Sequence, residues 1–157
     1  MTEVDVTVAS TDAMERLGAR LALCAGEGDY IALCGEIGAG KTTLARGALH
    51  GLGHVGVVKS PTYTIVESYR LGTRTVHHLD LYRLADPQEL EYFGVWDYFD
   101  EVSLKLVEWP ERGASVLPEP DVLVTIRVEN DERRRVHLAG VTCAGARTLE
   151  RMLASEA

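Results

Sequence analysis

The amino-acid sequence predicts a single-domain α/β fold in which helices flank a mixed central β-sheet. The first observation is an apolar run at residues 30–34 that leads directly into a glycine-rich turn and then a helical pattern. The second is a clean alternation of apolar residues over 122–128. The third is that several strand patterns follow the early strand, loop and helix, so strands and helices do not alternate strictly. A length of 157 residues fits one domain, covering 1–157.

The first 52 residues carry four predicted elements. Valines alternate with polar residues at the start, as in a half-buried strand, and Ser10 and Thr11 can cap the helix that follows. The run at 30–34 is almost wholly apolar, as expected of a central strand that is buried on both faces. The four elements are a strand over 4–8, a helix from 11 to about 25, a strand over 30–34 and a helix over 42–52.

The rest of the chain is predicted to be richer in strands. Leu71, Gly72 and Thr73 form a turn between two of them, and Asp86 caps a helix with Pro87 at its first position. The predicted elements are strands over 62–69 and 75–79, short helical pieces over 88–100, strands over 102–107, 122–128 and 135–138, and a helix over 146–153.

Composition and charge exclude several classes of protein. The apolar fraction of 46% and the charged fraction of 25% are ordinary for a soluble globular protein. A net charge of −8 argues against a free-standing nucleic-acid binder, since neutralising phosphates supplies much of that affinity. The N-terminal residues do not resemble a secretory signal, and no apolar run is long enough to span a membrane. Three cysteines without C-x-x-C spacing suit a reducing cytosol, so a cytoplasmic location is expected.

The stretch GEIGAGKTT, Gly35 to Thr43, predicts a site for the phosphates of a nucleoside triphosphate. It matches G-x-x-x-x-G-K-[ST] and lies between an apolar strand and a helix, as this motif requires. The amides of residues 38–42 would converge on the β-phosphate at the helix N-terminus. Lys41 would reach the β- and γ-phosphates, and the Thr42 hydroxyl would bind Mg²⁺. The fold prediction is therefore a P-loop NTPase, with a nucleoside triphosphate and Mg²⁺ as its ligands.

Two acidic residues and a threonine are candidates for completing this site. Glu108 follows one apolar strand and Asp80 ends another, where P-loop enzymes place carboxylates near the metal. Either residue could instead be a solvated carboxylate at a strand end. The Thr62 hydroxyl, after a turn at Ser60 and Pro61, could sense a γ-phosphate or simply lie on an exposed strand face.

Other polar residues leave alternatives open. His77 and His78 are adjacent on a strand and point to opposite faces, so core positions are expected for them rather than a shared metal site. Trp109 could belong to the core, to a wall of the site or to a partner contact. The run 133–135, three arginines, could be a solvated hairpin turn, an arginine reaching the nucleotide or a basic patch facing an RNA-bearing complex.

Missing motifs narrow the kind of NTPase. The chain has no N-K-x-D sequence, which GTPases use to read guanine, and no L-S-G-G-Q signature of transport ATPases. A small-molecule kinase remains an alternative, although no long arginine-rich insertion is present to act as its lid.

Four segments together resemble the TsaE (YjeE) family of bacterial ATPases. They are GEIGAGKTT, VKSPTYTIVESY, HHLDLYRL and LVEWPER, in this order and spacing. The resemblance implies a monomeric ATPase whose ATP hydrolysis is weak without its partners. It would bind the TsaB–TsaD heterodimer and would contact tRNA only indirectly, through that complex. Its ATP hydrolysis would support formation of N6-threonylcarbamoyladenosine at position 37 of tRNAs that read codons beginning with A, while TsaD performs the transfer. A non-catalytic, ATP-dependent assembly module is a further alternative.

The resemblance also implies roles for individual residues. Asp80 would position the attacking water or contact the metal indirectly, assisted by Lys41 and by the switch-type Thr62. Thr42 and Glu108 would be the Mg²⁺ ligands. The residues expected to contact the nucleotide are Thr11, Gly38, Ala39, Gly40, Lys41, Thr42, Thr43 and Arg133.

Overall fold

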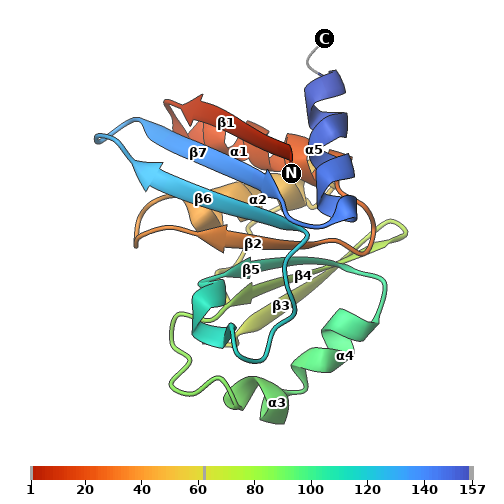
Figure 1. Ribbon diagram of the computed structural model, residues 1–157. Helices are drawn as coiled ribbons and strands as arrows, with labels where there is room; N and C mark the ends of the chain where they lie inside the picture. Colours follow the sequence, from red (N-terminus) through yellow and green to blue (C-terminus); the bar gives the residue numbers. More distant parts are fainter. Residues whose placement is uncertain (1, 62, 156–157) are drawn as a thin grey trace.

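The computed structural model describes residues 2–61 and 63–155, which form one seven-stranded sheet with helices around it (Figure 1). The strand order is β1-β7-β6-β2-β5-β4-β3. The strands are β1 (Thr2–Val8), β2 (Tyr30–Cys34), β3 (Val66–Leu71), β4 (Arg74–Asp80), β5 (Leu104–Glu108), β6 (Val122–Val128) and β7 (Arg134–Gly140). The helices are α1 (Thr11–Cys24), α2 (Lys41–Gly51), α3 (Glu89–Phe93), α4 (Val95–Asp100), the 3-10 helix η1 (Pro110–Gly113) and α5 (Cys143–Ser155).

The sheet is mixed, with the apolar strand β2 at its centre. β2 runs parallel to β5 and β6, and β4 runs parallel to β5. The pairs β1–β7, β6–β7 and β3–β4 are antiparallel. The predicted α/β class is thus confirmed. Because β2, β4 and β5 are parallel, their carboxyl ends share one edge of the sheet, and ligands of such sheets commonly bind there.

Helices cover the two faces of the sheet unequally. α1 and α2 pack on one face over the larger core, and α3, α4 and η1 pack on the other (Figure 1). α1 and α2 approach so closely that a Cβ at Gly47 would lie 2.1 Å from the Glu15 carbonyl oxygen. This contact fixes α2, and with it the loop that precedes α2, against the sheet.

Several element boundaries differ from the sequence prediction. β3 begins at Val66 rather than 62, because the amide of Ile65 bonds back to Pro61 in a turn. α3 begins at Glu89, since the Asp86 carboxylate accepts the Gln88 amide in a turn before the helix. β5 begins at 104 rather than 102, and α5 at 143 rather than 146. These shifts leave the order of the elements as predicted.

Within the described ranges, no helix combines the length and apolar character needed to cross a membrane. The three cysteines are free thiols in the structure.

Candidate functional site

The loop between β2 and α2 is shaped by glycines. Gly40 precedes α2 with φ of 116°, and Gly38 has φ of 80°, conformations that a side chain would strain. A Cβ at Gly40 would also lie 3.0 Å from the Met14 side chain. No side chain caps the N-terminus of α2, so its first amides point toward the loop without a side-chain partner. This end of the helix has the geometry of an anion site.

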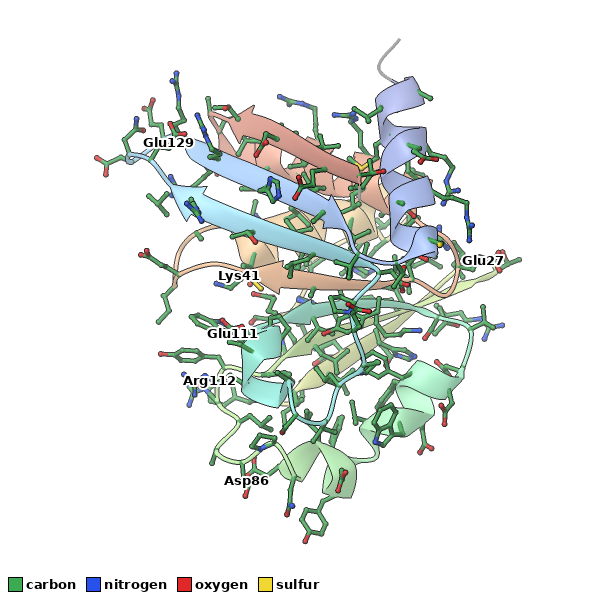
Figure 2. All side chains as sticks on the ribbon, viewed as in Figure 1. Glu27, Lys41, Asp86, Glu111, Arg112 and Glu129 are labelled. Carbon is green, nitrogen blue, oxygen red and sulfur yellow. The ribbon has the colours of Figure 1, made fainter. Side chains whose placement is uncertain are left out.

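Lys41 is buried at the start of α2. Its Nζ donates to the carbonyls of Gly35 and of Glu36, the latter at 2.8 Å, and lies 4.2 Å from the centre of the Trp109 ring. Burial lowers the pKa of Lys41, and the nearby carboxylates of Glu108, Glu111 and Asp80 oppose that shift. Figure 2 shows Lys41 at the end of β2, close to η1. The ammonium group is held in the loop by carbonyl oxygens, with acidic side chains around it.

Two buried carboxylates lie beside this lysine. Asp80 and Glu108 are paired in register at the carboxyl ends of β4 and β5. The Thr42 hydroxyl lies 2.9 Å from Oε1 and 3.0 Å from Oε2 of Glu108. A cavity of about 330 Å³ opens over these groups. Its lining comprises Ile37, Gly38, Gly40, Lys41, Thr42, Thr43, Ser60, Asp80, Tyr82, Glu108 and Trp109.

The surroundings of Asp80 shift the pKa of its carboxylate upward. Burial raises the pKa of Asp80, and the charge of Glu108 raises it further. The Tyr82 amide, which donates to Asp80 Oδ1 at 3.0 Å, and the charge of Lys41 act in the opposite direction. A carboxylate with a raised pKa is a stronger base than one in water. Asp80 therefore suits the handling of a proton or the orientation of a water molecule.

His78 contacts the site although its neighbour does not. The fully buried His78 ring places Nε2 2.7 Å from Glu108 Oε2. His77 faces the other side of the sheet, where it bonds Ser68 and Glu101 and packs edge-on against Tyr98. The predicted opposite orientation of the two histidines is confirmed. Because side chains alternate along a strand, the sequence places His78 on the same face as Asp80. This spacing was the signal from which the contact of His78 with the site could have been predicted.

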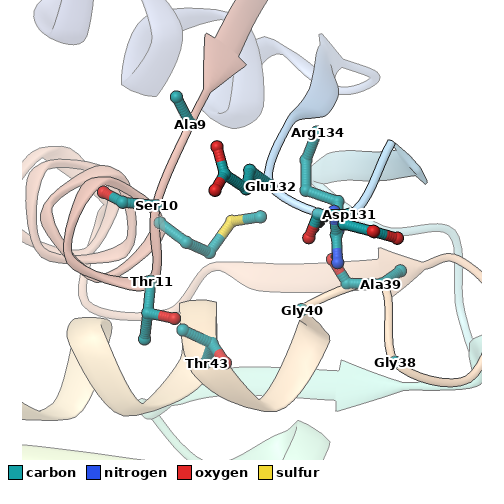
Figure 3. Close-up of a pocket in the computed structure, with 11 residues that line it drawn as sticks. Ala9, Ser10, Thr11, Gly38, Ala39, Gly40, Thr43, Asp131, Glu132 and Arg134 are labelled. Atoms are coloured by element: carbon teal, nitrogen blue, oxygen red, sulfur yellow. Dashed lines mark hydrogen bonds between the residues drawn. The ribbon is translucent and has the colours of Figure 1, made fainter. Parts of the chain in front are cut away.

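A second cavity, of about 480 Å³, lies on the other side of the loop (Figure 3). The first turn of α1 and the β6–β7 hairpin form its walls. It shares Gly38, Gly40 and Thr43 with the first cavity, so the two cavities meet at the loop between β2 and α2. The residues that line it are Ala9, Ser10, Thr11, Met14, Gly38, Ala39, Gly40, Thr43, Asp131, Glu132 and Arg134.

The similarity of the chain to known proteins shows its family. The model for "Threonylcarbamoyl adenosine biosynthesis protein TsaE" matches residues 8–154. The chain belongs to the TsaE family. This result confirms the resemblance drawn from the four sequence segments.

Individual members of the TsaE family show how far the similarity extends. The "tRNA threonylcarbamoyladenosine biosynthesis protein TsaE" of Haemophilus influenzae is 56% identical over 101 residues, a match that spans 64% of this chain and 64% of the relative. The protein of the same name from Streptomyces coelicolor is 39% identical over 138 residues, covering 85% of this chain and 93% of the relative. The crystal structure of Bacillus subtilis YdiB superposes with a TM-score of 0.86 at 25% identity, over 99% of this chain and 97% of that one.

The structure gathers most of the residues singled out in the sequence. Lys41, Thr42, Asp80 and Glu108 line one cavity, and Thr11 lines the other. Thr62 lies outside the described residues. The sequence analysis missed Met14, Ser60 and Tyr82 as lining residues and left Trp109 open; Trp109 forms part of a cavity wall.

The arginine run resolves into three different environments. Arg134 folds back on the loop, with Nε donating to Ala39 O at 3.1 Å, and lines the second cavity. Arg135 pairs with Glu129, and Arg133 is exposed and is not part of the described lining. Strand alternation predicts that Arg134 and Arg135 of β7 point to opposite faces, but the hairpin turn between β6 and β7 sets which of them points at the loop.

The oxygen donors at the loop fit a magnesium ion. Thr42 and Glu108 supply a hydroxyl and a carboxylate at one point, and the described residues contain no cluster of three or more His, Cys, Asp or Glu that could hold a metal alone. Mg²⁺ commonly takes only one or two protein oxygens and completes its shell with phosphates and water. A metal bound together with a nucleotide suits this donor set.

Proposed function

We propose that this chain is a MgATP-binding ATPase that supports formation of N6-threonylcarbamoyladenosine in tRNA. It acts with the TsaB–TsaD heterodimer and does not itself transfer the threonylcarbamoyl group. Membership of the TsaE family, whose description names this biosynthesis, supports the pathway. The observation that carries the ATPase is the meeting of the Thr42 hydroxyl with the Glu108 carboxylate beside Lys41, at the end of a glycine-shaped loop.

The residues of the first cavity divide the work of hydrolysis between them. The amides of 38–42 cradle the β-phosphate, and Lys41 neutralises charge on the β- and γ-phosphate oxygens. Thr42 and Glu108 hold Mg²⁺, which when bound offsets charge that develops on the transferring phosphoryl group. Asp80, with its raised pKa, orients the attacking water. Positioning and charge neutralisation suffice here, without a covalent protein intermediate.

The second cavity is our candidate for the nucleoside. It opens from the same loop and is lined by the Thr11 hydroxyl, the Met14 thioether and acidic groups of the hairpin. Thr43 borders both cavities, so a bound nucleotide would extend across the loop, with its phosphates in the first cavity and its nucleoside in the second. Arg134 would hold the loop by its bond to Ala39.

An exposed residue at the first cavity suits a site that is completed by a partner. Ile37 lines the cavity and is 71% exposed. Apolar side chains left open beside a polar site are the groups that a partner surface would cover. This supports hydrolysis that is weak alone and increases in the complex.

Reconstitution tests the proposal directly. ATP turnover and threonylcarbamoylation of tRNA are measured with TsaB and TsaD, with and without this chain. We expect this chain to raise both, and turnover to require Mg²⁺. ATP binding without turnover would favour a non-catalytic assembly module, and phosphorylation of an added small acceptor would favour a kinase.

The variant Asp80→Asn separates binding from hydrolysis. Asn keeps the shape of the side chain but cannot act as a base, so we expect turnover to fall about 100-fold, the usual scale of acid–base assistance. ATP affinity should stay within about threefold, because Asn removes a like charge rather than a phosphate ligand. Asp97→Asn, an exposed carboxylate of α4, is the control. Lost ATP affinity in Asp80→Asn would rule out the water-orienting role.

A further inference from the structure

We propose that His78 is a positioning residue for the Glu108 carboxylate, and that it sets the affinity of the site for Mg²⁺. This inference rests on the proposed function, in which Glu108 is a magnesium ligand. His78 does not line the first cavity and would touch neither the metal nor the nucleotide. It acts through the single hydrogen bond that joins it to Glu108.

The sheet itself places the two side chains together. His78 is paired with Leu106 in the β4–β5 register, and Asp80 is paired with Glu108 two residues further on. His78 and Glu108 are therefore diagonal neighbours on one face, within reach of long side chains. His78 is fully buried, and the Glu108 side chain is 3% exposed. A contact between two such buried groups on a rigid sheet holds one geometry.

The hydrogen bond fixes which nitrogen of His78 carries the proton. Nε2 lies 2.7 Å from the carboxylate oxygen, and the buried Nδ1 has no hydrogen-bond partner among the residues the structure describes. A proton on Nδ1 would leave a buried donor unpaired, which is costly, while a proton on Nε2 is accepted by Glu108. The neutral tautomer with hydrogen on Nε2 therefore matches this environment.

The bond to His78 limits how the Glu108 carboxylate can rotate. Oε2 accepts from His78, and the Thr42 hydroxyl lies within 3.0 Å of both oxygens. The plane of the carboxylate is thus fixed from the core side by the neutral imidazole ring of His78. Outer partners that orient ligands in this way commonly change metal affinity 10- to 100-fold when they are removed.

His77 provides a matched control within the same strand. It is also a buried histidine in two hydrogen bonds, but these go to Ser68 and Glu101 on the opposite face. Substituting His77 therefore removes an imidazole of similar burial without touching the loop, Thr42 or Glu108. Any effect that His78 and His77 variants share is a general effect on the stability of β4.

The decisive experiment measures ATP affinity against Mg²⁺ concentration in the wild type and in His78→Leu, His78→Gln and His77→Leu. In His78→Leu we expect the half-saturating Mg²⁺ to rise about 10- to 100-fold. ATP affinity in EDTA should stay within about twofold, because the phosphate contacts are intact. His78→Gln, whose amide can donate from the Nε2 position, should recover much of the loss, and His77→Leu should match the wild type.

A second measurement needs no nucleotide. In the nitrogen NMR spectrum of the free protein we expect His78 in the Nε2-protonated form, with a signal that shifts in Glu108→Gln. Unchanged Mg²⁺ dependence in folded His78→Leu, equal losses with and without Mg²⁺, or an Nδ1-protonated His78 would each overturn the inference. If wild-type protein bound no ATP at any Mg²⁺ concentration, the proposed function would fail instead, and the two failures are thereby distinguishable.

Discussion

Opposite edges of the same sheet bury charged residues in different ways. At the carboxyl ends of β2, β4 and β5, the buried groups Lys41, Asp80 and Glu108 line a cavity of about 330 Å³. At the amino ends of β2, β5 and β6, Asp29 and Lys105 are buried and Asp121 is half-buried. None of these three residues lines the described cavities. The chemistry of the side chains is alike, and only their partners differ.

At the amino-end edge, the charged groups bond to the protein itself. Asp121 accepts the Tyr30 amide at 2.7 Å and the Thr142 hydroxyl at 2.6 Å. Asp29 accepts the Gly26 amide and the buried Thr148 hydroxyl. These bonds tie α5 and the loop before β2 to the sheet. Buried polar groups with protein partners of this kind stabilise a fold.

The carboxyl-end edge is arranged for a ligand instead. Its helix N-terminus has no side-chain cap, and its charged groups gather around a cavity at a loop shaped by Gly38 and Gly40. Burial of charge therefore does not identify a functional site by itself. A site is indicated where buried charges, a helix N-terminus without a side-chain cap and a cavity coincide.

The largest expected contrast comes from Lys41→Met. The substitution would remove the two charge-assisted contacts to phosphate oxygens that we propose for Lys41, worth about 4 kcal/mol together, so ATP affinity should fall about 1,000-fold. The free energy of unfolding should change little, because the variant also removes the cost of burying the ammonium group. Calorimetric titration with ATP and urea unfolding measure the two effects. Tight ATP binding by the folded variant would contradict the assignment of the loop.

The sequence predicted the parts of this site that obey local rules. The prediction of a glycine-rich loop between a strand and a helix required only the spacing of Gly35, Gly40 and Lys41. The placement of Glu108 and Asp80 followed from apolar runs that end in a carboxylate, and the register of β4 with β5 brings the two together. The mixed sheet followed in the same way from the order of strand patterns.

The remaining features depend on contacts that sequence spacing does not encode. The role of His78 required knowing that β4 and β5 are adjacent and parallel, since its partner is thirty positions away in the chain. The choice of Arg134 over Arg133 depended on the hairpin turn. The late start of β3 depended on Ile65, a β-branched residue with φ of 67° that local propensity would not place there.

Asp121→Ala at the amino-end edge should have a smaller effect than Lys41→Met, and the effect should be on stability and not on ATP affinity. The variant leaves the Tyr30 amide and the Thr142 hydroxyl without their acceptor, at a cost of about 3 kcal/mol. The melting temperature should fall by roughly 6–12 °C for a chain of this size. ATP affinity of the folded variant should equal that of the wild type, because the site lies at the other edge. A parallel loss of affinity would show that the two edges are coupled.

The smallest effect compares how the two edges respond to pH. Burial raises the pKa of Asp80 above its usual 3.8. At a pH between 3.8 and the raised native pKa, Asp80 therefore holds a proton in the native state that it has lost in the unfolded chain. The stability of the wild type relative to Asp80→Asn should therefore fall as pH rises from about 3.8 through the raised native pKa. Burial lowers the pKa of Lys105 below its usual 10.5, so here the unfolded chain holds the extra proton.

For Lys105 the change of stability with pH has the opposite sign. The stability of the wild type relative to Lys105→Met should rise with pH between the lowered native pKa and 10.5, and stay constant above that interval. Urea unfolding of the wild type and both variants across a pH series measures the two differences. A flat difference for Lys105→Met would mean that its bond to the Gly28 carbonyl and the nearby Asp121, Glu101 and Asp29 fully offset the cost of burial. A flat difference for Asp80→Asn would mean that the carboxyl-end edge is as well compensated as the amino-end edge, which would remove the basis for treating Asp80 as a poised base.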